Sequence, residues 1–91
     1  MKYRKKPVII EAFKLTKETE FDSLPEWAKE AYSVDETVEL FRFYLTPDGA
    51  NINTLENQMS AKWGDYIIQG VRGEIYSCRG DIFVETYEEA E

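Results

Sequence analysis

Residues 63–83 read WGDYIIQGVRGEIYSCRGDIF, and this glycine-punctuated stretch decides the fold that we expect for the chain. It contains the single cysteine and two Gly-Asp pairs, which lie sixteen residues apart. Short apolar runs bounded by glycine are typical of β-strands, and GVRG at residues 70–73 predicts a tight turn between two of them. We therefore predict three short strands, at residues 65–69, 74–78 and 81–87.

The residues before this stretch predict a strand, a helix and a hairpin. Residues 3–15 alternate in side-chain character after Pro7, with Phe13 and Leu15 on one face, which is typical of a strand. Residues 24–33, LPEWAKEAYS, predict one short helix with Pro25 in its first turn. Either Asp22 or Ser23 is expected to cap it.

A hairpin is expected in the middle of the chain. Residues 38–45, VELFRFYL, are rich in strand-forming side chains, and TPDGAN at residues 46–51 is a strong turn signal. Residues 52–61 are predicted to return as one weaker strand, with Asn57-Gln58 as a possible second turn. Residues 34–37 are expected to be a polar connection.

Together these elements predict an α+β fold. We expect one curled, mostly antiparallel sheet of about five to six short strands, with a single short helix packed on it. The length of 91 residues predicts a single domain over residues 1–91, with 88–91 as a frayed tail. Free sheet edges favour pairing with another chain, so a homodimer or higher homo-oligomer is expected.

Charge and composition exclude several classes of function. The net charge is −7, and because the first six residues carry +4, residues 7–91 carry −11. Such an acidic body repels phosphates, which makes nucleic acid an unfavourable partner. The absence of histidine excludes a Ser-His-Asp triad. No apolar run long enough to span a membrane is present. A lone cysteine, Cys78, excludes an intrachain disulfide and fits a reducing cytoplasm.

Aromatic and charged side chains of the opening stretch are the candidate binding residues. Aromatic residues make up 14% of the chain, more than a small core needs, and exposed rings on a sheet can anchor a protein or stack on a nucleotide-like ligand. The candidates are Trp63, Asp65, Tyr66, Arg72, Glu74, Tyr76, Arg79 and Asp81. No catalytic residue, metal ligand or cofactor is assigned, and Cys78 is expected to be structural.

The Gly-Asp pairs leave an alternative open. Asp after Gly commonly fixes a turn through its own backbone, and this is the favoured interpretation of Gly64-Asp65 and Gly80-Asp81. In the alternative, Asp65, Glu74 and Asp81 hold a divalent cation in an enzyme that acts on a nucleotide or phosphodiester. A third option is a virion or assembly component that works only as an oligomer.

Two stretches resemble one family of small bacteriophage and prophage proteins. MKYRKKPVIIEAF at residues 1–13 resembles the family's opening, and GDYIIQGVRGEIYSCRGDIFVETYEE at residues 64–89 resembles its ending. TLENQM at residues 54–59 is similar to a hairpin that members commonly have. The chain departs from the family pattern at four turn positions, where Trp63, Ser77 and Gly80 replace proline and Asn57 replaces glycine.

The resemblance implies an origin rather than a mechanism. It implies a phage accessory protein that acts in the cytoplasm of a bacterial host cell. With the composition, it leads us to expect a non-catalytic binding protein. Such a protein would interfere with a host process or defence by occluding a host protein or by sequestering a nucleotide-like ligand.

Overall fold

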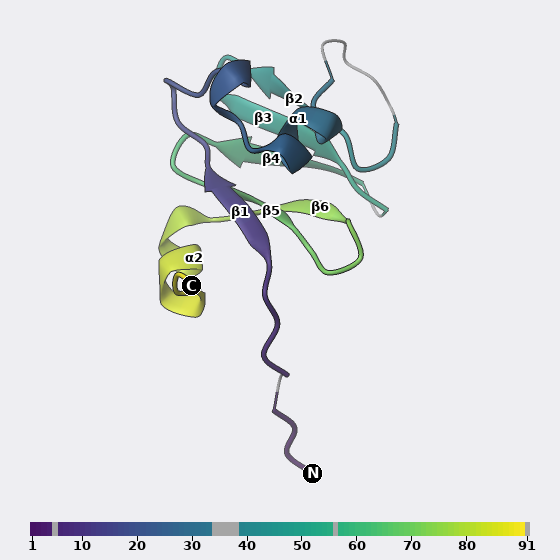
Figure 1. Cartoon of the computed structure of the whole chain (residues 1–91), viewed down its shortest axis with the longest axis vertical. Coiled ribbons are helices and arrows are strands. Elements are labelled where there is room, and N and C mark those ends of the chain that lie inside the picture. Colours follow the sequence, from purple (N-terminus) through teal and green to yellow (C-terminus); the bar gives the residue numbers. More distant parts are fainter. Residues whose placement is uncertain (5, 34–38, 56, 91) are drawn as a thin grey trace.

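The computed structural model describes residues 1–4, 6–33, 39–55 and 57–90. Within these ranges the chain forms an α+β structure of six short antiparallel strands and two α-helices (Figure 1). The strands make two three-stranded sheets, so the expected single curled sheet is wrong. The expected connection at residues 34–37, Val38 at the start of the predicted hairpin strand, and Glu91 of the predicted tail lie outside the described residues.

Sheet A contains the two strands predicted on either side of GVRG, and the order of its strands is β1-β5-β6. Its strands are β1 (Glu11–Lys14), β5 (Tyr66–Gln69) and β6 (Ile75–Cys78). The predicted turn is confirmed, because the Gly70 N–H donates to the Glu74 carbonyl oxygen at 2.8 Å. The same turn explains why β1 is shorter than predicted, since β5 ends before Gly70 and leaves the residues before Glu11 without a partner.

Sheet B is the predicted hairpin with a third strand added, in the order β2-β3-β4. Its strands are β2 (Phe43–Thr46), β3 (Gly49–Asn53) and β4 (Gln58–Lys62). The predicted turn at Pro47-Asp48 is confirmed. Residues 52–61 do not form one return strand, because Thr54 Oγ1 donates to the Asn57 carbonyl oxygen at 2.5 Å and closes a turn. The possible second turn therefore lies earlier than the predicted Asn57-Gln58, since Gln58 is already the first residue of β4. This turn separates β3 from β4.

The helix α1 (Glu26–Ala31) begins later than predicted. Pro25 is its capping residue rather than part of its first turn. Asp22 and Ser23 do not cap it, since they belong to the 3-10 turn η1 (Phe21–Ser23). The Ser23 hydroxyl donates instead to the Glu20 carbonyl oxygen at 2.7 Å.

A second helix, α2 (Gly80–Thr86), stands where a strand was predicted over residues 81–87. Ile82 and Val84 favour a strand by intrinsic propensity, yet both are exposed on this helix. The helix places Phe83 and Tyr87 one turn apart, and their rings stack with centroids 4.8 Å apart. A helix therefore brings the two rings within stacking distance, whereas a strand would hold them on one face but about 13 Å apart.

The main core lies between the two sheets and α1. Phe43 is fully buried at its centre, with its ring 6.1 Å from that of Phe13 and 5.5 Å from that of Tyr32. Both sheets and α1 supply further members, such as Ala28, Ile52, Ile67 and Ile75, and the segments that follow β1 and η1 supply Leu15 and Leu24. None of the helices in the described ranges has the length and apolar character needed to cross a membrane.

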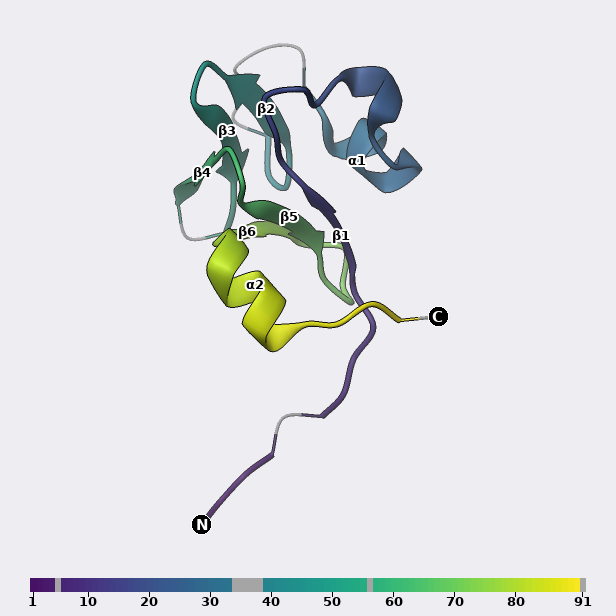
Figure 2. The same ribbon diagram turned by 90° about the vertical axis from the view of Figure 1, so that its left-hand side faces the viewer.

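The first ten residues, called the arm below, carry no secondary structure in their described part. Figures 1 and 2 both show the start of the arm running away from the two sheets, toward one end of the molecule. The end of the arm leads into β1 at the edge of sheet A. The arm therefore begins in solvent and ends beside the outer face of sheet A, on which α2 lies.

Candidate binding groove

The two Gly-Asp pairs meet in space, and Asp65 holds them together. Its carboxylate accepts the Lys62 N–H at 3.0 Å and the Gly80 N–H at 3.4 Å. A Cβ atom on Gly80 would overlap the carbonyl oxygen of Gly64, so no larger residue fits where α2 leaves the sheet. The favoured interpretation of Asp65 as part of a turn is confirmed, and its carboxylate also positions α2.

The other two candidate metal ligands are also engaged locally. Asp81 pairs with Arg79 at 2.8 Å and accepts the Ile82 N–H at 2.9 Å. Glu74 accepts the Arg72 N–H at 2.9 Å in the turn before β6, whereas Asp81 follows β6. Four strand residues between them span about 13 Å. No cluster of three ligands able to hold a metal ion occurs in the part of the chain that the structure describes.

Some of the candidate binding residues thus lie in turns, and others lie on a face of sheet A. Trp63 is half-buried and donates its indole N–H to the Pro47 carbonyl oxygen at 3.2 Å, which ties the hairpin turn to the end of β4. Arg72 is exposed in the turn between β5 and β6. Of the eight candidates, the structure brings only Tyr66 and Tyr76 together on the outer face of sheet A, which α2 covers.

An aromatic stack joins α2 to this outer face. The Tyr66 and Phe83 rings are nearly parallel, at 9°, with centroids 3.8 Å apart, and Tyr87 continues the stack from Phe83. Tyr87 also hydrogen-bonds to Tyr76. The sequence prediction did not include Phe83 and Tyr87 among the binding residues, and their spacing of four residues brings the two rings into contact only because the segment is a helix.

Burial under α2 changes the acidity of two groups. The pKa of Tyr76 is raised to about 12, first by burial and then by Tyr87 and other neighbouring groups. Burial also raises the pKa of the Cys78 thiol, with a further contribution from the Asp65 and Asp81 carboxylates. A thiol with a raised pKa is a poor nucleophile at neutral pH, which agrees with the structural role expected for Cys78.

We expect one tyrosine of the folded protein to ionise near pH 12, well above the ordinary value of 10. A raised pKa means that folding favours the protonated phenol. This stabilisation is therefore complete below pH 10 and is lost as the pH rises through 12. Ultraviolet titration of phenolate should show a late phase that Tyr76→Phe removes and Tyr87→Phe moves to lower pH. A late phase that persists in Tyr76→Phe would assign it to another tyrosine.

A groove with a volume of about 860 Å³ lies between the arm and α2. Residues 7–12 form one wall, the outward side of α2 and residues 86–90 form the other, and Tyr66 and Phe83 lie between them. Most of the lining is apolar, and it includes two strongly exposed side chains, Ile9 at 74% and Val84 at 65%. An apolar groove of this size is suited to hold a segment of another chain.

The charged side chains that line the groove, among the described residues, are all acidic. Its described lining includes Glu11, Glu88 and Glu89 and no basic residue. All three glutamates are exposed, and none of the ion pairs among the described residues involves them. The groove therefore combines an apolar interior with an acidic rim, a combination that attracts cationic ligands and repels phosphates.

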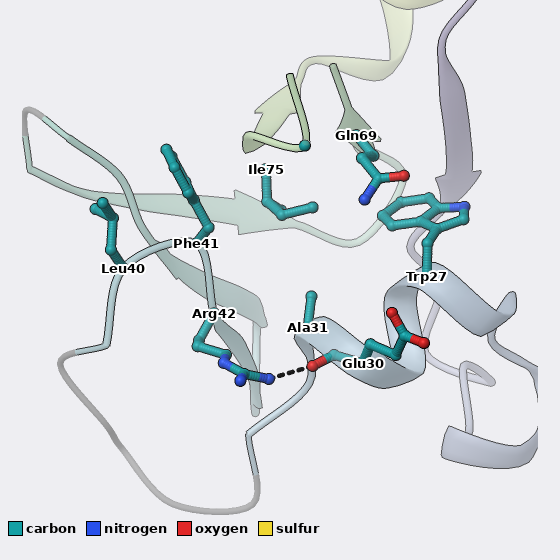
Figure 3. Close-up of a pocket in the computed structure, with 9 residues that line it drawn as sticks. Trp27, Glu30, Ala31, Leu40, Phe41, Arg42, Gln69 and Ile75 are labelled. Atoms are coloured by element: carbon teal, nitrogen blue, oxygen red, sulfur yellow. Dashed lines mark hydrogen bonds between the residues drawn. The ribbon is translucent and has the colours of Figure 1, made fainter. Parts of the chain in front are cut away.

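A second, smaller cavity of about 310 Å³ lies between α1 and the β5–β6 turn (Figure 3). Phe41 on its rim has a left-handed backbone, with φ at 58°, which interrupts the strand predicted over residues 38–45. Arg42 is the one basic residue among the described lining, and its guanidinium is engaged by the Glu30 carbonyl oxygen and the Glu39 carboxylate. This cavity therefore lacks an available cation for a phosphate.

Comparisons of the chain with protein-family models, with curated proteins and with solved structures give no match.

Proposed function

We propose that this chain is a non-catalytic binding protein whose groove holds an extended, basic segment of a partner protein. The observation that carries the proposal is the groove itself, which joins an apolar lining to a rim of three glutamates. Extended segments bind such surfaces by seating apolar side chains in the groove while charged side chains meet the rim. The resemblance to small phage and prophage proteins supports a host protein as the partner.

The arrangement of charges favours a protein segment over the nucleotide-like ligand. A nucleotide brings phosphates, which the groove's glutamates repel, and the cavity beside α1 has its arginine already engaged. A cation-dependent enzyme is less well supported, because the carboxylates of Asp65, Glu74 and Asp81 each accept a backbone N–H, and Glu74 does so in the turn before β6, apart from the two aspartates. Binding without catalysis therefore agrees best with the side chains that the structure brings together.

Substituting Val84 by lysine tests this function. Val84 lines the groove and is exposed, so the substitution adds a positive charge to the apolar wall without opening a cavity. We expect Val84→Lys to weaken binding of a labelled ten-residue peptide of alternating valine and lysine at least tenfold, measured by fluorescence anisotropy. Ile82→Lys is the matched control, since Ile82 is an exposed apolar residue of the same helix that does not line the groove.

The sign of the peptide's charge provides the second comparison. A peptide in which glutamate replaces every lysine should bind at least tenfold more weakly than the basic peptide, and added salt should reduce the difference. Equal binding of the two peptides, or wild-type affinity in Val84→Lys, would contradict the proposed function.

A further inference from the structure

We propose that the groove of one copy binds the arm of a second copy, and that the two copies exchange their arms in a symmetric dimer. This inference rests on the proposed function, because it assigns an occupant to the same groove. It also assigns a means of regulation, since an exchanged arm covers the surface that an outside partner needs. Two observations, one on the arm and one on the groove, carry it.

The side chains of the arm are basic and apolar, as expected for a segment that binds in this groove. Lys2, Arg4 and Lys6 are exposed, and no ion pair between described residues involves them. Between them lies Tyr3, which is 87% exposed, and before them Met1, which is fully exposed. Basic and apolar side chains therefore alternate over residues 1–4, and two further basic residues, Lys5 and Lys6, follow in the sequence.

The groove complements the arm in sign and in length. Three glutamates line the groove, and three basic side chains stand on the described part of the arm, to which the sequence adds Lys5. Six extended residues span about 20 Å, and the groove wall formed by residues 7–12 also consists of six residues. The first six residues of one copy can therefore lie along the whole wall of another.

The edge of sheet A makes a second copy a better occupant than an unrelated chain. β1 is an edge strand that pairs only with β5 among the described strands, and the arm continues from its start. Edge strands present unpaired N–H and C=O groups. An antiparallel pairing about a two-fold axis between residues 6 and 7 places residues 1–6 of each copy alongside residues 7–12 of the other, of which Glu11 and Ala12 belong to the edge strand β1. One symmetric contact therefore satisfies backbone and charge together.

A charge exchange between two variants of the full chain tests the proposal. The first variant, K2E/R4E/K6E, has an acidic arm and keeps its acidic groove. The second, E11K/E88K/E89K, keeps the basic arm and has a basic groove. We expect the wild-type chain to be a dimer by native mass spectrometry and sedimentation equilibrium, and each variant alone to dissociate at least tenfold more readily. Mixed in equal amounts, the two should form a heterodimer, because both of its arm–groove contacts are again opposite in charge.

The matched control is K17E/K62E/R72E. It changes three exposed basic residues outside the arm and the groove by the same total charge, and it should remain a dimer. A monomeric wild type, a control that dissociates like the arm variant, or a mixture that stays monomeric would each overturn the inference. The last result would assign the arm to the groove of its own copy. If the inference fails while Val84→Lys still loses the basic peptide, the proposed function stands without it.

Discussion

Replacing Phe43 by alanine is expected to lower the free energy of unfolding by about 3–5 kcal/mol, the usual loss for a buried phenylalanine. Phe43 is fully buried where β2 faces α1 and sheet A, and its ring contacts those of Phe13 and Tyr32. Alanine would leave a cavity bordered by all three of these units. Because a small domain is stable by only about 5–15 kcal/mol, this one change removes a large share of its stability.

Urea denaturation followed by circular dichroism measures this loss. The matched control is Phe21→Ala, since Phe21 is 47% exposed and has one ring neighbour, Tyr32, at 5.5 Å. That substitution should cost less than about 1.5 kcal/mol, the range of an exposed aromatic pair. Equal losses in the two variants would mean that Phe43 does not occupy the centre of the core.

Replacing Gly49 by alanine is expected to destabilise sheet B by about 1–3 kcal/mol through overpacking alone. A Cβ atom at this position would overlap the Ala61 carbonyl oxygen and come within 2.9 Å of the Lys62 Cα atom. Both of these are backbone atoms of β4, which pairs with β3. The clash cannot be relieved by rotating a side chain, so the β3–β4 pairing itself must shift.

Gly64→Ala separates this clash from backbone strain. Gly64 has a positive φ, at 98°, but apart from its chain neighbours no atom lies within 4 Å of the position that its Cβ would take. A left-handed backbone costs an ordinary residue roughly 1–2 kcal/mol, and this cost is all that Gly64→Ala should show. Thermal unfolding of the two variants should therefore place Gly49→Ala below Gly64→Ala in melting temperature. The reverse order would contradict the close approach of β3 and β4 at Gly49.

Much of the candidate site could not be predicted from the sequence, for a physical reason. Tyr66 and Tyr76 were predicted because they stand on recognisable strands, and the structure places both on the outer face of sheet A. Val84 and Glu88 were not predicted, since the groove forms only when the two ends of the chain come together. Residues 7–12 and 86–90 are separated by almost the whole sequence, and no local pattern connects them.

The sequence by itself determined those local elements for which all the sequence signals indicate the same structure. Alternation and glycine placement determined β5, the turn at residues 70–73 and β6, and the Pro-Asp-Gly run determined the hairpin of β2 and β3. In these places propensity, side-chain pattern and turn chemistry indicate one structure. The division into two sheets was decided by tertiary pairing, because β5 pairs with β1 from the start of the chain rather than with the preceding strand β4.

Only tertiary contacts decided which secondary structure residues 80–86 adopt. Ile82 and Val84 favour a strand, but a strand would hold the Phe83 and Tyr87 side chains about 13 Å apart, too far for their rings to stack as they do. As a helix, the segment stacks Phe83 on Tyr66, lets Tyr87 reach Tyr76, and has its first N–H bound by Asp65. These contacts outweigh a local preference worth at most about 1 kcal/mol. They also create the groove, because a strand in that place would leave the arm without an opposite wall.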